Sequence, residues 1–463
     1  MRIKKISVKN LFDYYCYDID LKKENISIIH APNGYGKTTV FRMISHVLYL
    51  EVVELYEIPF SDFIIEFSDD IIIKVNKQIS KRYENCNDED VIIDFKILQS
   101  DNIEVEFEIP ISRFSCDRIK EYGLDEYLQR LEMRRRHGAP EDREHLINYR
   151  KRYDKYYDYI IKKHLKVNYI DSNRLFDNTP LISKKRLSVR ERFIGEDMDR
   201  YSTESGYDGG DYRKRNRNRD NENIVRDAEN ILEKIREARH VYGLEAEKKD
   251  RNFPDRLVSF VNSNQEFYND KQIKEHLAEL ENKRVELESA GLVLPGAKTL
   301  NPSDSIDDTM RKFYTLYIKD TMGKLSLYDD IMGKLKLFME IINGKTSFSN
   351  KTMYIDNEKG VVFEPIKSNS GMTHSIPLEK LSSGEKHDFI MFYELIFNSD
   401  RASVFLIDEP EISLHVAWQM EFIDVLNQIC GLNGAQAIIA THSPDIVNGH
   451  DDLLISLGLE EDK

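Results

Sequence analysis

Residues 31–39, APNGYGKTT, have the types and the spacing that can hold the phosphates of a nucleotide. Gly34 and Gly36 let backbone N–H groups turn towards phosphate oxygens, and Lys37 can bridge the β and γ phosphates. The hydroxyl of Thr38 can bind Mg²⁺, and the start of the following helix favours an anion. The expected nucleotide ligands in this loop are Asn33, Gly34, Gly36, Lys37, Thr38 and Thr39.

The flanking residues supply the context that such a loop needs. Residues 26–30, ISIIH, predict a buried strand before the loop, and a helix is expected to follow Lys37. Ala31 stands where the common pattern has glycine, a small departure because alanine keeps most of the room. The alternative interpretation of the loop is a chance glycine turn.

A second group of acidic residues follows an apolar run. In VFLIDEPE, residues 404–411, four apolar residues predict a buried strand, and Asp408 and Glu409 stand at its carboxyl end. Open α/β sheets bind their ligands at that end. We expect Asp408 to hold Mg²⁺ and Glu409 to orient or deprotonate an attacking water molecule. The alternative is an acidic turn after a core strand.

Two shorter motifs complete the set. In LSSGEK, residues 381–386, a hydroxyl and backbone amides stand at a helix start, where an anion can bind. The expected ligands there are Ser382, Ser383, Gly384 and Glu385; the alternative is an ordinary helix cap. In ATHSPDIV, His442 follows an apolar strand and can hydrogen-bond a γ-phosphate, although a single histidine is also compatible with a structural role.

The elements that must position these residues indicate an α/β protein in three segments. Residues 1–115 predict the phosphate loop and three β-rich runs forming an antiparallel meander, and residues 346–463 return to α/β character. Between them, residues 116–345 predict a charged helical insertion with a short coiled-coil hairpin, whose arms span about 20–25 residues. Residues 203–223 are polar and glycine-rich, which predicts a mobile loop.

The overall composition limits the class of protein. Of 463 residues, 40% are hydrophobic and 32% charged, and the net charge is −15, so the whole surface is not suited to nucleic acid. Four cysteines without a Cys-x-x-Cys pair predict no zinc site and fit a reducing compartment. No apolar run is long enough for a membrane helix. We therefore expect a cytoplasmic protein with no membrane partner.

The order of the motifs resembles the ABC-type ATPase heads of the SMC, Rad50, RecF and OLD families. LSSGEK resembles their signature motif, LIDEPEISLH their Walker B and D-loop, and THSP their switch histidine. The resemblance covers roughly residues 1–110 and 350–450 and implies an ABC-type head split by a helical insertion. The family's Q-loop glutamine has no clear counterpart; Gln129 is in the wrong context, and the segment Asn168–Arg174 is the remaining candidate.

The resemblance also implies cofactors and partners. It implies ATP and Mg²⁺, slow hydrolysis, and two ATPs held between two heads, each completed by the Ser382 and Gly384 of the other chain. The chain further resembles ATPase subunits of bacterial anti-phage systems, in layout those of the PARIS system, with Septu and retron ATPases similar. That implies a ring-like oligomer such as a hexamer, a separate TOPRIM-type nuclease, and an acidic phage anti-restriction protein as trigger.

Basic stretches leave a second function open. Residues 134–137, 150–164 and 213–219 place arginine and lysine, with tyrosine, where DNA or an acidic protein could bind, or on an ordinary solvated surface. The competing hypothesis is a DNA-repair ATPase of the RecF or Rad50 kind. The missing zinc hook and the short hairpin make a Rad50-like tether unexpected. The ABC subunit of a transporter is a third class, which the antiparallel meander and the charged insertion argue against.

Overall fold

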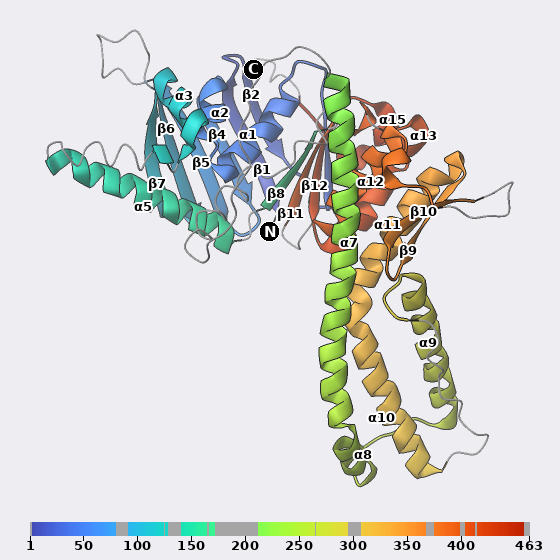
Figure 1. Cartoon of the computed structure of the whole chain (residues 1–463). Coiled ribbons are helices and arrows are strands. Elements are labelled where there is room, and N and C mark those ends of the chain that lie inside the picture. Colours follow the sequence, from blue (N-terminus) through green and yellow to red (C-terminus); the bar gives the residue numbers. More distant parts are fainter. Residues whose placement is uncertain are drawn as a thin grey trace, which may run out of the picture. The chain divides into compact units, whose positions relative to one another are not determined.

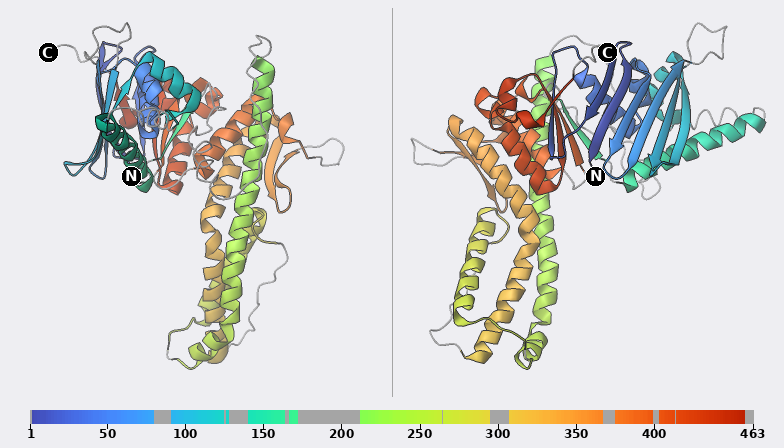
Figure 2. Two further views of the ribbon diagram at one scale, coloured as in Figure 1. Left: turned by 60° about the vertical axis from the view of Figure 1, so that its left-hand side comes forward. Right: turned by 180° about the vertical axis from the view of Figure 1, so that it is seen from behind.

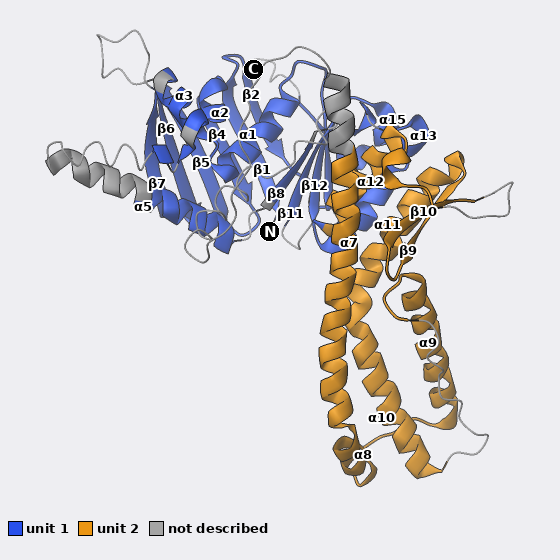
Figure 3. Ribbon diagram, in the orientation of Figure 1, with its two compact units in different colours: residues 1–204, 398–463 blue, residues 205–397 orange. Residues whose placement is uncertain are grey.

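The computed structural model describes residues 2–79, 91–124, 126–127, 140–163, 166–171, 212–263, 265–294, 307–366, 375–398, 403–412 and 414–457. The chain forms two compact units (Figure 3). Residues 1–204 and 398–463 form the first, and residues 205–397 form the second. No helix in these described ranges is both long and apolar enough to cross a membrane.

A five-stranded parallel sheet in the first unit carries the phosphate loop. Its strands, in the order β13-β3-β12-β11-β8, are Leu454–Ser456, Ile26–His30, Gln436–Thr441, Ser403–Asp408 and Lys166–Asp171 (Figure 1). All residues of β11 and β12 are buried, as expected for strands covered on both faces. Because the strands are parallel, their carboxyl ends meet at one edge of the sheet.

A six-stranded antiparallel sheet forms the rest of the β structure in this unit (Figure 2). In the order β2-β1-β4-β5-β6-β7 its strands are Tyr15–Asp20, Ile3–Leu11, Asp62–Phe67, Ile71–Ile79, Val91–Gln99 and Asn102–Ile111. Buried and partly exposed residues alternate along β4 and β6, so one face packs on the core. The expected meander is confirmed, but the first of its three predicted runs is two strands joined by a turn at Asp70, where φ is 56°.

One hydrophobic core joins both sheets of the first unit. It includes residues of β1, β4–β7, β11 and β12 together with helices α1, α3 and α5. The side chain of Gln436 on β12 accepts from the N–H of Ile3 and donates to its carbonyl, at 2.8 and 2.9 Å, which ties the parallel sheet to β1. The helices of this unit are α1 (Lys37–Tyr49), α2 (Val52–Glu57), α3 (Arg113–Tyr122), α5 (Pro140–Lys162), α13 (Val416–Gln419), α14 (Phe422–Asn433) and α15 (Pro444–Val447).

The second unit is a helical hairpin with a β-hairpin and the helix that carries the LSSGEK motif (Figure 3). Its helices are α7 (Tyr212–Arg251), α8 (Phe253–Val261), α9 (Asp270–Ser289), α10 (Asp308–Leu325), α11 (Asp329–Thr346) and α12 (Ser383–Phe397). Strands β9 (Lys351–Asp356) and β10 (Gly360–Pro365) form the expected β-hairpin. The predicted segment 346–463 is therefore divided between the units, since its residues up to 397 belong to the second unit and the rest to the first.

Helix α7 corrects two expectations. It has 40 residues, or about 60 Å at the helical rise, so this arm is longer than the predicted 20–25 residues. Residues 212–223, predicted as part of a mobile loop, form its first turns, while residues 203–211 lie outside the described ranges. Apolar residues at helical spacing form one buried side of each helix, namely Ile224, Ile231 and Ile235 of α7 and Ile273, Leu277 and Leu280 of α9.

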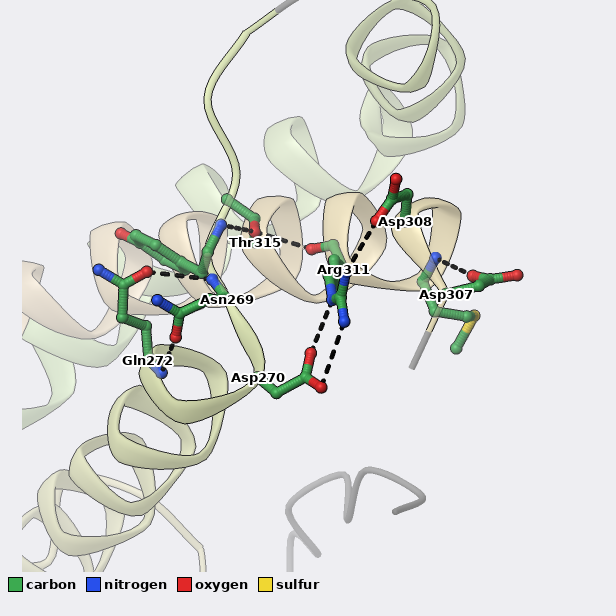
Figure 4. A network of polar contacts seen from close by, with 9 residues as sticks. Asn269, Asp270, Gln272, Asp307, Asp308, Arg311 and Thr315 are labelled. Carbon is green, nitrogen blue, oxygen red and sulfur yellow. Dashed lines mark hydrogen bonds and ion pairs between the residues drawn. The ribbon is translucent and has the colours of Figure 1, made fainter. Parts of the chain in front are cut away.

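Side-chain caps hold the starts of helices α9 and α10 (Figure 4). Asn269 and Gln272 form a capping box at the start of α9, with bonds of 2.9 and 3.0 Å. Asp307 caps α10, and Arg311 of α10 pairs with Asp270 of α9 at 2.6 Å. Such caps favour one defined arrangement of the two helices over a frayed end.

Candidate nucleotide site

The phosphate loop lies between β3 and α1 and has the backbone that its glycines allow. Gly34 and Gly36 have φ of 89° and 78°, in the left-handed region that favours glycine. A Cβ atom added at Gly36 would also approach the side chain of Leu11 to 3.0 Å. Ala31 is buried and is not among the residues with positive φ, so its position does not require glycine.

The side chain of Lys37 is enclosed by its own loop. Lys37 is 5% exposed, and its Nζ atom donates to the carbonyls of Ala31 at 2.6 Å and Pro32 at 3.2 Å. Both acceptors are neutral, so a phosphate would supply the negative charge that this ammonium group lacks in these two bonds. The α1 N-terminus, where Thr38 and Thr39 lie, adds backbone donors and a favourable dipole for the same anion.

Asp408 ends strand β11 at the same sheet edge. It is 4% exposed and accepts a hydrogen bond from the Tyr169 hydroxyl of β8 at 3.1 Å. Strand β12 lies between β11 and β3 in the sheet. Strand β3 leads into the phosphate loop. A buried carboxylate and the Thr38 hydroxyl are the oxygen donors that Mg²⁺ prefers. Mg²⁺ is usually held in proteins by one or two carboxylates together with substrate phosphates.

Glu409 follows Asp408 in a sharp turn. Its φ is 48°, and its N–H donates to the carbonyl of Ala440 on β12 at 2.8 Å. This bond fixes an uncommon backbone conformation, which in proteins often occurs at functional positions. The side chain remains a quarter exposed, and its Oε1 lies 3.9 Å from His442 Nδ1. A partly exposed carboxylate beside a histidine has the chemistry of a general base.

Glu411 holds the predicted histidine in place. Its carboxylate accepts from the Thr441 hydroxyl at 2.9 Å and from the His442 N–H at 3.2 Å, and it lies 3.1 Å from His442 Nδ1. The side chain of Glu411 is 9% exposed, whereas that of His442 is 44% exposed. Glu411 is not among the residues predicted from the sequence, although its place two residues after Glu409 is a signal.

Aromatic side chains lie beside the phosphate loop. Tyr15 stacks on Tyr17 with centroids 5.6 Å apart and lies 5.8 Å from Tyr35, which belongs to the loop itself. The Tyr17 hydroxyl donates to the Tyr35 carbonyl at 2.9 Å. Burial, followed by the charges of Tyr15 and Tyr35, raises the pKa of the Tyr17 hydroxyl, which stays neutral. None of these tyrosines is among the site residues predicted from the sequence. Their flat rings could stack on a nucleotide base.

The LSSGEK motif belongs to the second unit. Ser382, Ser383 and Gly384 are exposed at the start of α12, and Ser382 and Glu385 form a reciprocal cap, with bonds of 2.7 and 3.3 Å. Lys386 is buried and donates to the side chain of Asn221 on α7 and to the Glu379 carbonyl, both at 2.7 Å.

The structure thus gathers part of the predicted site. Lys37, Thr38, Asp408 and Glu409, together with His442, follow neighbouring strands of one parallel sheet, as the sequence predicts. The motif at residues 382–385 lies in the other compact unit. The Q-loop candidate is partly in view, because β8 ends at Asp171, paired in register with Asp408, while residues 172–174 lie outside the described ranges.

A parallel sheet with a phosphate loop after one strand and buried acids after another defines an ATPase of the P-loop class. The chain belongs to the AAA ATPase domain family, which it matches over residues 1–447. The search of curated proteins gave no match. Among solved structures, the chain is similar to "the SmcHead bound to the C-winged helix domain of ScpA", over 98% of this chain and 94% of that one, with 11% identity and a TM-score of 0.33.

Proposed function

We propose that this ATPase works as an assembly of two or more copies, in which the LSSGEK loop of one chain completes the ATP site of another. In this proposal the phosphate loop at residues 31–39 binds the phosphates through Gly34, Gly36 and Lys37. Thr38 and Asp408 hold Mg²⁺, and Glu409 activates water. Bound Mg²⁺ would neutralise phosphate charge during hydrolysis.

The observation that carries this proposal is the division of motifs between the two units. The phosphate loop, Asp408, Glu409 and His442 belong to the first unit, whereas residues 382–385 belong to the second. Ser382, Ser383 and Gly384 are exposed at a helix start, where hydroxyl and backbone donors are available to an anion held by another chain. An ATP held between two chains would make assembly depend on nucleotide.

The experiment is a complementation assay with two inactive chains. Lys37→Ala removes the phosphate grip but leaves the LSSGEK loop intact, and Ser382→Arg blocks that loop but leaves the phosphate site intact. Mixed in equal amounts, the two are expected to hydrolyse ATP several times faster than either alone, because a mixed pair contains one complete site. If mixing restores no activity although both variants are folded, the proposed shared site is wrong.

We further propose that this ATPase is the sensor and scaffold subunit of an anti-phage complex. In motifs and layout the sequence resembles AriA, the ATPase of the PARIS system, which supports control of a separate TOPRIM-type nuclease, AriB-like, and an acidic phage anti-restriction protein as trigger. Co-purification of such a nuclease and its release by an acidic DNA mimic would test this role.

The alternative is a DNA-repair ATPase, and one surface favours it. Lys151, Arg152, Lys155 and Lys162 are exposed on α5. A repair ATPase should bind duplex DNA and hydrolyse ATP faster in its presence, with a strong dependence on salt. DNA-stimulated hydrolysis by a chain that retains no nuclease would overturn the defence role in favour of this one.

A further inference from the structure

Glu385 is held by residues far from it in sequence. Its Oε1 accepts from the Ser349 hydroxyl at 2.6 Å, and Lys351 Nζ lies 2.8 Å from both carboxylate oxygens. The remaining bond to Oε2 comes from the backbone N–H of Ser382 at 2.7 Å. The carboxylate of Glu385 therefore links the start of α12 to Ser349 and Lys351, which lie between the end of α11 and the start of β9.

The Glu385 and Lys351 side chains are partly enclosed. The side chains of Glu385 and Lys351 are 12% and 21% exposed. Burial alone would raise the pKa of Glu385, but the hydrogen bonds from Lys351, Ser349 and Ser382 outweigh it and lower that pKa to about 2. Charge-assisted bonds of this kind are shorter and stronger than neutral ones. The carboxylate therefore stays ionised, and stays bound, at any pH well above that value.

The bonds act on the backbone of the LSSGEK loop. Because Glu385 accepts from the N–H of Ser382, and the Ser382 hydroxyl accepts in turn from the N–H of Glu385, the position of the carboxylate fixes the turn that presents Ser382, Ser383 and Gly384. An ordinary capping box has the same two bonds but a carboxylate exposed to water. Here Lys351 and Ser349 fix the carboxylate as well.

We propose that Lys351, assisted by Ser349, is a positioning residue for ATP hydrolysis that acts through Glu385 on the LSSGEK loop. This inference rests on the proposed function, in which that loop completes the ATP site of another chain. In the proposed assembly, Lys351 supports the loop that faces the nucleotide of another chain, and it belongs to a different unit from the phosphate loop of its own chain. Its loss should therefore reduce turnover in the assembly while leaving ATP binding to the phosphate loop intact.

The test compares Lys351→Met with Lys351→Arg. Lys351→Met keeps the length of the side chain but leaves the partly buried Glu385 carboxylate without its cation. We expect kcat for ATP to fall about tenfold or more, with the Kd for a fluorescent ATP analogue changed less than about twofold. Lys351→Arg keeps the charge and two donors and should restore most of kcat. The matched control is Lys271→Met, which removes an 87% exposed lysine of the same unit and should change neither value.

Mixing separates failure of this inference from failure of the proposed function. Lys351→Met chains mixed with Lys37→Ala chains should regain activity, because the latter supply an intact LSSGEK loop. If Ser382→Arg is complemented but Lys351→Met is not, or if Lys351→Met alone keeps full kcat, the positioning role is wrong. If neither is complemented, the shared site is wrong and the positioning role falls with it. Should Lys351→Met unfold, Ser349→Ala is used in its place, with the same outcomes and a smaller loss of kcat.

Discussion

At the scale of single residues, Lys37 shows how the loop prepares for its ligand. Lys37 is 5% exposed, and its ammonium group donates to two neutral carbonyls of its own loop. We expect Lys37→Ala to abolish ATP binding, with the Kd raised at least about 100-fold, because the strongest positive charge of the site is lost. Titration of a fluorescent ATP analogue measures this change. Lys23→Ala, at an exposed position, is the control; normal binding by Lys37→Ala would mean that the site lies elsewhere.

Glu411 is expected to matter because it supports Thr441 and His442. It accepts hydrogen bonds from the Thr441 hydroxyl and the His442 N–H. Glu411→Ala leaves the buried Thr441 hydroxyl without this acceptor and should reduce the free energy of unfolding by about 1–3 kcal/mol. Because His442 then loses the carboxylate that lies 3.1 Å from its Nδ1 atom, kcat should fall while ATP binding persists. Urea unfolding and steady-state hydrolysis measure the two effects, and an unchanged kcat would show that His442 needs no such support.

At the scale of elements, α7 and α12 pack around an unusual carboxylate. Asp227 of α7 is fully buried, and among the described residues its Oδ2 has no hydrogen-bond partner, while Oδ1 accepts from Arg226 at 3.0 Å. Burial, opposed by Arg226 and reinforced by the charge of Glu394, raises the pKa of Asp227 to about 6. The folded chain therefore binds a proton more tightly than the unfolded chain does.

The sign of the pH effect follows from this raised pKa. Between pH 3.8 and about 6 the unfolded chain loses this proton while the folded chain keeps it. The free energy of unfolding therefore falls as the pH rises through that window. Asp227→Asn should remove this loss and raise the free energy of unfolding at pH 8 by roughly 1–3 kcal/mol. Urea unfolding of both chains at pH 5 and pH 8 gives the difference. Asp255→Asn is the exposed control, and equal shifts in both variants would refute the assignment to Asp227.

The same elements show what the sequence could and could not predict. The sequence predicts Asp408 and His442 each directly after an apolar strand, because a short apolar run bounded by polar residues is typical of a buried strand. The start of α7 was missed because residues 212–223 carry no apolar stripe, yet a helix extends easily once the buried stripe from Ile224 onward has nucleated it. Ser349 and Lys351 could not be linked to Glu385, because no periodicity relates positions more than 30 residues apart that meet only in the folded unit.

At the scale of the whole molecule, the division into two units bears on assembly. Residues 31–39 and Glu409 lie in the first unit, and residues 382–385 lie in the second. If hydrolysis separates the assembled chains, a chain that binds ATP but cannot activate water should stay assembled. Glu409→Gln meets that condition, since the amide keeps the shape of the side chain but cannot accept the proton of the attacking water.

We expect Glu409→Gln to bind ATP normally, to hydrolyse it at least about 100-fold more slowly, and to accumulate as an assembly with ATP and Mg²⁺. Light scattering after size-exclusion chromatography measures the mass, which should be at least twice that of one chain with ATP and lower without it. The double variant Lys37→Ala with Glu409→Gln should not assemble in response to ATP, because the nucleotide can no longer join the chains. If Glu409→Gln has the mass of a single chain both with and without ATP, nucleotide does not drive assembly, and the ATP site of this chain must work without a partner.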